Sequence, residues 1–298
     1  MKQTLFYLAC LLTVAALLAG CTGISLPKPA VVSVSPTSAT VAATKPAGPT
    51  ATATISTPAV VTVGAPATTA PTVTNTPVPS KTPKPSATPK YAPVVKVANF
   101  VKTVDNPYFP LVPGSTSLFS GTRDTSKLIE QVSVTKKTRK IMSVTCIEVD
   151  SSLTVDDKLA EKAINWYAQD KQGNVWSFGA SVTQYSPAGK VTGSAGTWLA
   201  GSNGALPGII MQAKPDTSLT YRQDYSKGHA EDMAQVLSLT ESVTGTSTSY
   251  TNMLQIKEWS PLQPKIVVNK WYAKGVGLIM SKVVEGGNQD LQLIEAKK

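Results

Sequence analysis

A long segment rich in proline and threonine sets the main limit on how this chain can fold. Residues 27–90 contain 13 Pro, 15 Thr and 6 Ser, and they include no acidic and no aromatic residue. Proline fixes φ and removes a backbone donor, so neither a helix nor a central strand can run through this segment. Its side chains cannot bury enough apolar surface to offset the entropy of the chain. We therefore expect a disordered stalk here, and the folded core must come from the residues that follow it.

The charge of the chain divides near the same point. The formal net charge is +10, and eight lysines precede the first acidic residue, Asp105. Residues 1–104 therefore carry +8, and the remainder carries 20 basic against 18 acidic side chains, or +2. A nucleic-acid-binding domain would cluster Lys and Arg on a folded face. The nearly neutral C-terminal part argues against nucleic acid as a partner.

The first residues have the features of a secretory leader. Lys2 precedes an apolar run from Leu5 to Leu18, and small residues follow this run. The run is too short for a comfortable membrane span, which favours a signal peptide over a transmembrane helix. The Leu18-Ala19-Gly20-Cys21 sequence that ends the leader resembles the lipobox of bacterial lipoproteins. The resemblance implies that the leader is cut before Cys21 and that lipid is attached to this cysteine.

These features predict the organisation and the location of the chain. We expect a signal peptide over 1–20, a lipidated N-terminus and disordered stalk over 21–95, and one β-rich domain over 96–298. Two or three acyl chains on Cys21 would anchor the protein stably to the bacterial cell membrane, on its extracytoplasmic side. Cell-wall polymer or glycan is a further expected partner of the basic stalk. Cys146 would then be the one cysteine left, so no disulfide can form within the chain.

The C-terminal part has the pattern of a β protein. Short alternating or β-branched segments recur between turn signals, namely 117–122, 128–135, 141–149, 165–170, 175–178, 182–185, 190–193, 219–225, 254–259, 266–273, 278–284 and 291–294. We predict a mainly β fold, in which a curved antiparallel sheet forms an open barrel or half-barrel, with a sandwich as the alternative. Residues 154–164 and 229–237 fit helical spacing equally well, so we expect at most one or two short helices.

Five stretches of this domain carry a resemblance, namely Asp105–Leu111 with Pro113-Gly114, Trp166–Trp176, Pro207–Met211, Tyr221–Tyr225 and Ala230–Ala234. They are similar to an uncharacterised family of bacterial secreted proteins and lipoproteins. The resemblance implies a family but no activity. The last stretch of aromatic and glycine residues, 271–278, loosely resembles lipoprotein-carrier-like half-barrels and favours the curved sheet.

No motif in the sequence indicates catalysis or metal binding. His229 is the one histidine, so no pair of histidines can hold a metal ion within the chain. The sequence has no G-x-S-x-G, H-E-x-x-H, phosphate loop or C-x-x-C. We therefore predict no catalytic residue, no metal and no cofactor. His229 is expected in a polar loop or at the start of a short helix, and Cys146 is expected to be a small buried apolar residue.

Aromatic residues are the candidates for ligand binding, because Trp and Tyr often line sites for sugars, lipids and peptides. We predict a non-catalytic binding or envelope-associated module, with a glycan or a small hydrophobic molecule as its ligand. The alternative is a secreted hydrolase with an unrecognised site. A cavity lined by aromatic residues would favour binding, carboxylates converging on His229 in a cleft would favour the hydrolase, and a tightly filled core would favour a structural role. The candidate ligand-binding residues are Trp166, Tyr167, Trp176, Tyr221 and Trp271.

Overall fold

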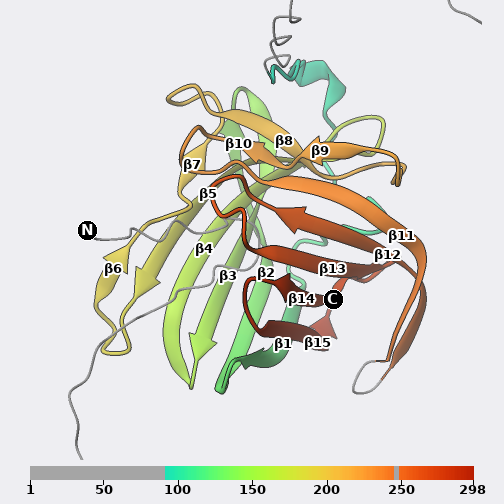
Figure 1. The fold of residues 1–298 in the computed structure, drawn as a ribbon. Coiled ribbons are helices and arrows are strands. Elements are labelled where there is room, and N and C mark those ends of the chain that lie inside the picture. The colour runs from blue at the N-terminus through green and yellow to red at the C-terminus, as the bar shows by residue number, and fades with distance from the viewer. Residues whose placement is uncertain (1–90, 245–247) are drawn as a thin grey trace, which may run out of the picture. The chain divides into compact units, whose positions relative to one another are not determined.

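The computed structural model describes residues 91–244 and 248–298, and nearly every element in this part is a strand (Figure 1). The predicted leader, Cys21 and the stalk up to residue 90 lie outside the described residues. The elements are η1 (Val97–Asn99), β1 (Thr116–Arg123), β2 (Ser126–Ile141), β3 (Val144–Val155), β4 (Lys158–Gln169), β5 (Val175–Tyr185), β6 (Val191–Gly193), β7 (Trp198–Leu199), β8 (Leu206–Met211), β9 (Thr220–Arg222), β10 (Asp224–Tyr225), β11 (Met233–Thr244), β12 (Ser249–Trp259), β13 (Val267–Ala273), β14 (Gly277–Glu285) and β15 (Gln289–Lys297).

The strands form one curved antiparallel sheet, which confirms the predicted fold class. Their order is β10-β8-β5-β4-β3-β2-β1-β15-β14-β13-β12-β11-β9, and β6 and β7 pair with β5. Two meanders, β1 to β5 and β11 to β15, are joined where β1 pairs with β15 over eight residue pairs. The sheet is nearly closed, as an open barrel is, so the sandwich alternative does not describe it.

Both windows that also fitted helical spacing belong to strands or turns. Residues 154–164 cover the end of β3, a turn at Asp156 and Asp157, and most of β4. Residues 229–237 lead into β11. The one helix in the described part is the short 3₁₀ turn η1. Pairing with neighbouring strands therefore decides the secondary structure of these two segments, because each is long enough to pair but too short to form a stable helix alone.

The chain passes from one edge strand of the sheet to the other within a few residues, and this connection closes the sheet. β9 pairs with β11 at one end, and β10 pairs with β8 at the other. Gln223 is the single residue between β9 and β10. The backbone at Gln223 passes close to β8, because a Cβ built on Gly208 would lie 2.4 Å from the carbonyl carbon of Gln223. Glycine at this position therefore permits the two ends to meet.

The concave side of the sheet holds the main hydrophobic core. Ile147 and Val149 of β3 point into it, whereas Val144 and Cys146 join a second cluster on the opposite face. β3 is thus buried on both faces. The predicted strand 141–149 began too early, because Met142 and Ser143 have φ of 48° and 65° and form the turn before β3.

The segment before β1 fills one end of the concave side. Val104, Tyr108, Phe109 and Leu111 pack into the main core. Asn106 fixes this segment: its side-chain amide donates to the carbonyls of Gly173 and Gln212, at 2.9 and 3.1 Å. No helix in the described part is long and apolar enough to cross a membrane.

Candidate functional site

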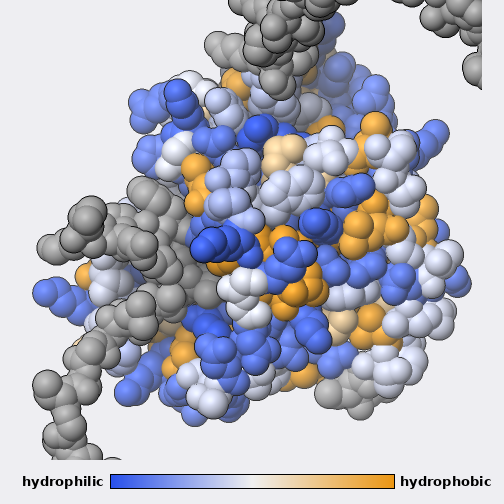
Figure 2. Space-filling view, viewed as in Figure 1, coloured by the Kyte–Doolittle hydropathy of each residue, from blue (hydrophilic) through white to orange (hydrophobic). Residues whose placement is uncertain are grey.

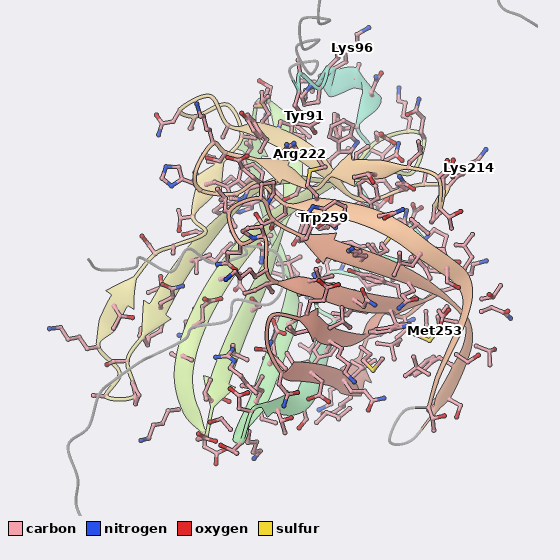
Figure 3. All side chains as sticks on the ribbon, viewed as in Figure 1. Tyr91, Lys96, Lys214, Arg222, Met253 and Trp259 are labelled. Carbon is pink, nitrogen blue, oxygen red and sulfur yellow. The ribbon has the colours of Figure 1, made fainter. Side chains whose placement is uncertain are left out.

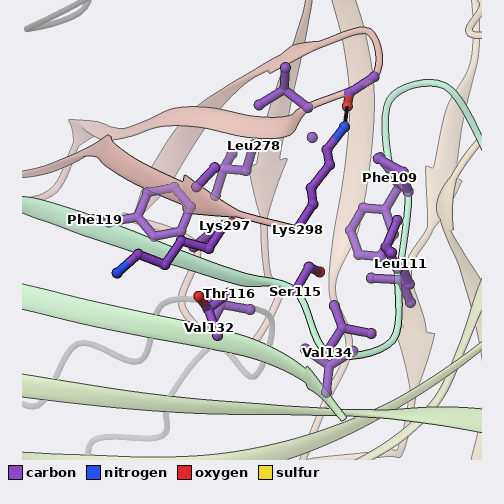
Figure 4. A pocket seen from close by; sticks show the side chains of 18 of the residues that line it. Phe109, Leu111, Ser115, Thr116, Phe119, Val132, Val134, Leu278, Lys297 and Lys298 are labelled. Atoms are coloured by element: carbon purple, nitrogen blue, oxygen red, sulfur yellow. Dashed lines mark hydrogen bonds between the residues drawn. The ribbon is translucent and has the colours of Figure 1, made fainter. Parts of the chain in front are cut away.

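The inner core contains an apolar cavity of about 110 Å³ beside the segment that fills the concave side (Figure 4). A single buried water needs only about 15 Å³ by this kind of measure, so the cavity has room for more than one water molecule. Its wall is mostly apolar and comes from six segments of the chain. The main side chains are Phe109, Leu111, Phe119, Val132, Val134 and Tyr167.

The cavity reaches the surface between the segment before β1 and the turn from β13 to β14. Val112 and Val276 both line it, and they are 44% and 36% exposed. Lys297 and Lys298 also line this mouth. Elsewhere, on the face viewed in Figure 2, hydrophobic side chains emerge in small groups between hydrophilic ones. The mouth therefore gives an apolar ligand access to an apolar wall, which is the usual construction of a small-molecule site.

A second feature of the concave side is a set of buried charged groups where the sheet closes. Lys270 on β13 forms an ion pair with Glu258 on β12, with 2.5 Å between Nζ and Oε2, and both side chains are 2% exposed or less. The amide of Gln223 donates to the other oxygen of Glu258 at 2.9 Å. Asp224 accepts a hydrogen bond of 2.7 Å from the backbone N–H of Asp232. We call these five residues the closing seam.

Burial raises the pKa of the carboxyl groups in this region. The pKa of Asp224 and that of Asp232 both rise, chiefly because of burial. The carboxylate of Glu258 adds to both shifts, and the carboxylate of Asp224 adds to that of Asp232, whereas the hydrogen bond from the Asp232 backbone opposes the rise in the pKa of Asp224. Further along the concave side, burial raises the pKa of Glu130 to about 8, although the charge of Lys270 opposes the shift. Burial also raises the pKa of Glu161 to about 8. Acids with such pKa values hold their protons near neutral pH.

Protonated carboxyl groups of the closing seam could act as proton donors, but a substrate cannot reach them. Its carboxyl groups are 2% exposed or less. His229 lies on the surface in the turn after β10, so the carboxylates do not converge on it in a cleft. In the described part of the chain, no group of three or more His, Cys, Asp or Glu side chains is placed to hold a metal ion. The seam is therefore suited to holding the sheet closed.

Beside the seam, a stack of aromatic rings and a guanidinium ties the start of the described chain to β10. The guanidinium of Arg222 lies over the ring of Tyr225 at 4.8 Å and over that of Tyr91 at 5.6 Å. Figure 3 shows Tyr91 next to Arg222, the last residue of β9. The hydroxyl of Tyr91 donates to the carbonyl of Pro207 at 2.8 Å. The folded region thus begins no later than Tyr91.

The structure divides the five aromatic candidates between the two faces of the sheet. Tyr167 lines the cavity, and Tyr221 packs against the same inner core. The three tryptophans are on the outer face. The indole of Trp166 donates to Glu148 at 3.3 Å, that of Trp176 donates to Asp170 at 2.8 Å, and Trp271 packs in a small outer cluster. The structure brings only Tyr167 and Tyr221 together, and a role for any of the five in binding stays a prediction.

Sequence reasoning missed most of the cavity wall and the whole seam. Phe109 and Leu111 lie in a stretch that was recognised only as a mark of family resemblance. The one signal for the seam was Lys270, a charged residue in the middle of an apolar strand segment. Cys146 is fully buried, as predicted, and burial raises the pKa of its thiol to about 12, so it is a poor nucleophile.

Comparisons with other proteins give a distant structural likeness. No protein-family model matches the chain, and no curated protein matches it. One similar solved structure is a protein of Bacteroides fragilis NCTC 9343 that is thought to be exported and has a YmcC-like fold, with 15% identity and a TM-score of 0.39. A second is a protein of Parabacteroides distasonis ATCC 8503 that is thought to be a lipoprotein, with 14% identity and a TM-score of 0.33. Each alignment covers 64% of this chain and 99% of the other.

Proposed function

We propose that this protein is a lipid-anchored extracytoplasmic binding protein whose β domain takes a small hydrophobic ligand into the cavity beside Phe109. The observation that carries the proposal is an apolar cavity with a partly exposed mouth at Val112 and Val276. A core built only for stability is packed to high density, and voids in it cost free energy. A cavity open to the surface is thus better explained by a ligand.

The anchor part of the proposal rests on the sequence around Cys21. Cys21→Ala should remove the lipid, so the protein should leave the membrane fraction or accumulate with its leader uncut. Cys10→Ala is the matched control, because Cys10 lies within the leader and should have no effect on anchoring. Unchanged, detergent-dependent membrane association of the Cys21→Ala protein would refute the anchor.

The binding part is preferred over the alternative of a secreted hydrolase. That alternative required carboxylates near His229 in a cleft. In the described residues, the converging acids are buried in the seam, and His229 is exposed and apart from the cavity wall. The cavity wall, by contrast, carries no acid and no histidine. It can hold an apolar chain, and it offers neither a carboxylate nor an imidazole for the acid–base chemistry of such a hydrolase.

A titration of the full chain with octanol tests the binding part. We expect saturable binding of one octanol per chain, measured by calorimetry. Val132→Trp should abolish it, because the added ring would occupy the cavity that Val132 lines. Ser133→Trp is the matched control, since the next residue along β2 points to the other face of the sheet. Absence of binding to the unaltered protein, or equal binding by both variants, would refute the proposal.

A further inference from the structure

We propose that the ligand of this cavity is an anionic amphiphile: its apolar chain lies in the cavity, and its carboxylate, sulfate or phosphate head group lies against lysines at the mouth. This inference rests on the proposed function and adds the class of ligand to it. It follows from the positions of the lysines near the mouth, and from the fact that two of them form no ion pair within the described residues.

Lys298 is the first of these cations. Its stem runs beside Leu278 toward the turn that follows β13, with Phe109 on the other side of the cavity (Figure 4). Its ammonium donates to the backbone carbonyl of Gly275 at 3.2 Å. No carboxylate of the described residues lies within 4 Å of it, so its charge is available to a ligand. The neighbouring Lys297 differs, because its ammonium is paired with Glu295 at 2.8 Å.

Lys274 supplies a second available cation on the same turn. Its ammonium lies over the ring of Tyr108, 5.6 Å from the ring centre, and it forms no ion pair within the described part of the chain. Lys274 is directly followed by Gly275 and Val276, both of which line the cavity. The ammonium of Lys298 also lies at this turn, because it donates to the carbonyl of Gly275. A head group beside the β13–β14 turn would therefore meet a lysine of the turn itself and one from the end of the described chain.

The apolar chain and the head group would have different roles in binding. Burial of the chain supplies most of the affinity, at about 0.8 kcal/mol per buried CH₂ group. An exposed ion pair adds little, and it weakens further as salt is added. Neutral amphiphiles should thus bind, anionic ones should bind better, and cationic ones should bind worst. A cavity that is only a packing defect would show no such order.

The test compares ligands with one chain and different head groups. The full chain is titrated by calorimetry with octanoate, octyl phosphate, octanol and octylamine at neutral pH. We expect both anions to bind about fivefold more tightly than octanol, which is what an exposed ion pair can contribute. The stronger of the two anions then identifies the head group. Added salt should reduce the difference between anions and octanol.

A double variant links this preference to the lysines. Lys274→Gln with Lys298→Gln should weaken the binding of the anions to the level at which the same variant binds octanol. Lys190→Gln, on the exposed turn between β5 and β6, is the matched control and should change nothing. Equal binding of all four ligands, or an anion preference that survives the double variant, would overturn the inference but leave the proposed function standing. Binding of none of them would overturn both.

Discussion

The cavity and the closing seam share the concave side of one sheet, but they are built from different kinds of residue. The wall of the cavity is apolar, has unfilled volume and reaches the surface at Val112 and Val276. The seam is charged and fully buried, with Lys270 held between strands by Glu258. Volume and access mark the cavity as the place for a ligand. Burial and internal pairing mark the seam as the device that closes the sheet.

The composition of the seam also explains how the sheet closes although few backbone pairs form at the closing point. β1 and β15 pair over eight residue pairs, whereas β9 and β10 pair with their neighbours over three and two. The short pairing at the closing point is supplemented by side chains, through Gln223 to Glu258 and through the backbone of Asp232 to Asp224. A hydrogen bond to a charged group contributes about 1.5–3 kcal/mol, more than a neutral one.

The largest expected effect comes from breaking the ion pair of the seam. Lys270→Met leaves Glu258 buried without its cation, and the free energy of unfolding should fall by about 3–5 kcal/mol. The double variant Lys270→Met with Glu258→Gln keeps an acceptor for Gln223 and should recover most of the loss. Denaturation in urea measures both. A loss below about 1 kcal/mol in the single variant would show that the seam does not hold the sheet.

The next effect concerns the dependence of stability on pH. Burial raises the pKa of Glu130 and of Glu161 to about 8 from the ordinary 4.5, so the folded protein binds protons that the unfolded chain has released between these values. Stability from these acids is fully present below pH 4.5 and is lost as the pH rises toward 8.

The free energy of unfolding should therefore be lower at pH 8 than at pH 5 by about 2 kcal/mol or more. Glu130→Gln should flatten part of this slope, because the amide does not titrate. Glu295→Gln is the control, since that side chain is 48% exposed and should leave the slope unchanged. Stability that rises with pH over this range would contradict the account.

A smaller effect is expected at Tyr91, which lies beside the seam. Tyr91→Phe removes the hydrogen bond to the carbonyl of Pro207 and should lower the free energy of unfolding by about 1 kcal/mol. Tyr91→Ala also removes the ring contacts with Arg222 and Tyr225, and it should cost about 1 kcal/mol more. Thermal unfolding of the two variants measures the difference. Equal stability of both variants would show that the ring contacts contribute nothing.

The smallest expected effect is at His229. Its side chain is exposed in a turn, so His229→Ala should change the free energy of unfolding by no more than about 0.5 kcal/mol. Metal analysis of protein prepared without chelators provides a second readout. Stoichiometric zinc or copper that disappears in this variant would contradict the assignment of His229 to a polar loop.

The strands could be predicted from sequence because their pattern is local. The predicted segments 165–170, 175–178 and 266–273 correctly indicated parts of β4 and β5 and the whole of β13. The pairing of β9 with β11 and of β10 with β8 could not be predicted. It depends on contacts between segments far apart in the chain, such as Gly208 against Gln223.

The candidate site was less predictable than the fold, for a physical reason. An aromatic residue in a strand can face either side of the sheet, and the register decides which. Tyr167 therefore points into the core while Trp166, the residue before it, packs on the outer face. Phe109 was harder still, because it lies in a segment without regular structure that the side chain of Asn106 holds in place.

The central claim is that an apolar ligand occupies the cavity and not the outer tryptophan surface. Intermolecular nuclear Overhauser effects between octanol and the full chain test it most directly. The account predicts contacts from the alkyl protons to the rings of Phe109 and Tyr167, which line the cavity, and none to Trp166 or Trp271. Contacts confined to the tryptophans, or no contact with either ring of the cavity wall, would contradict it.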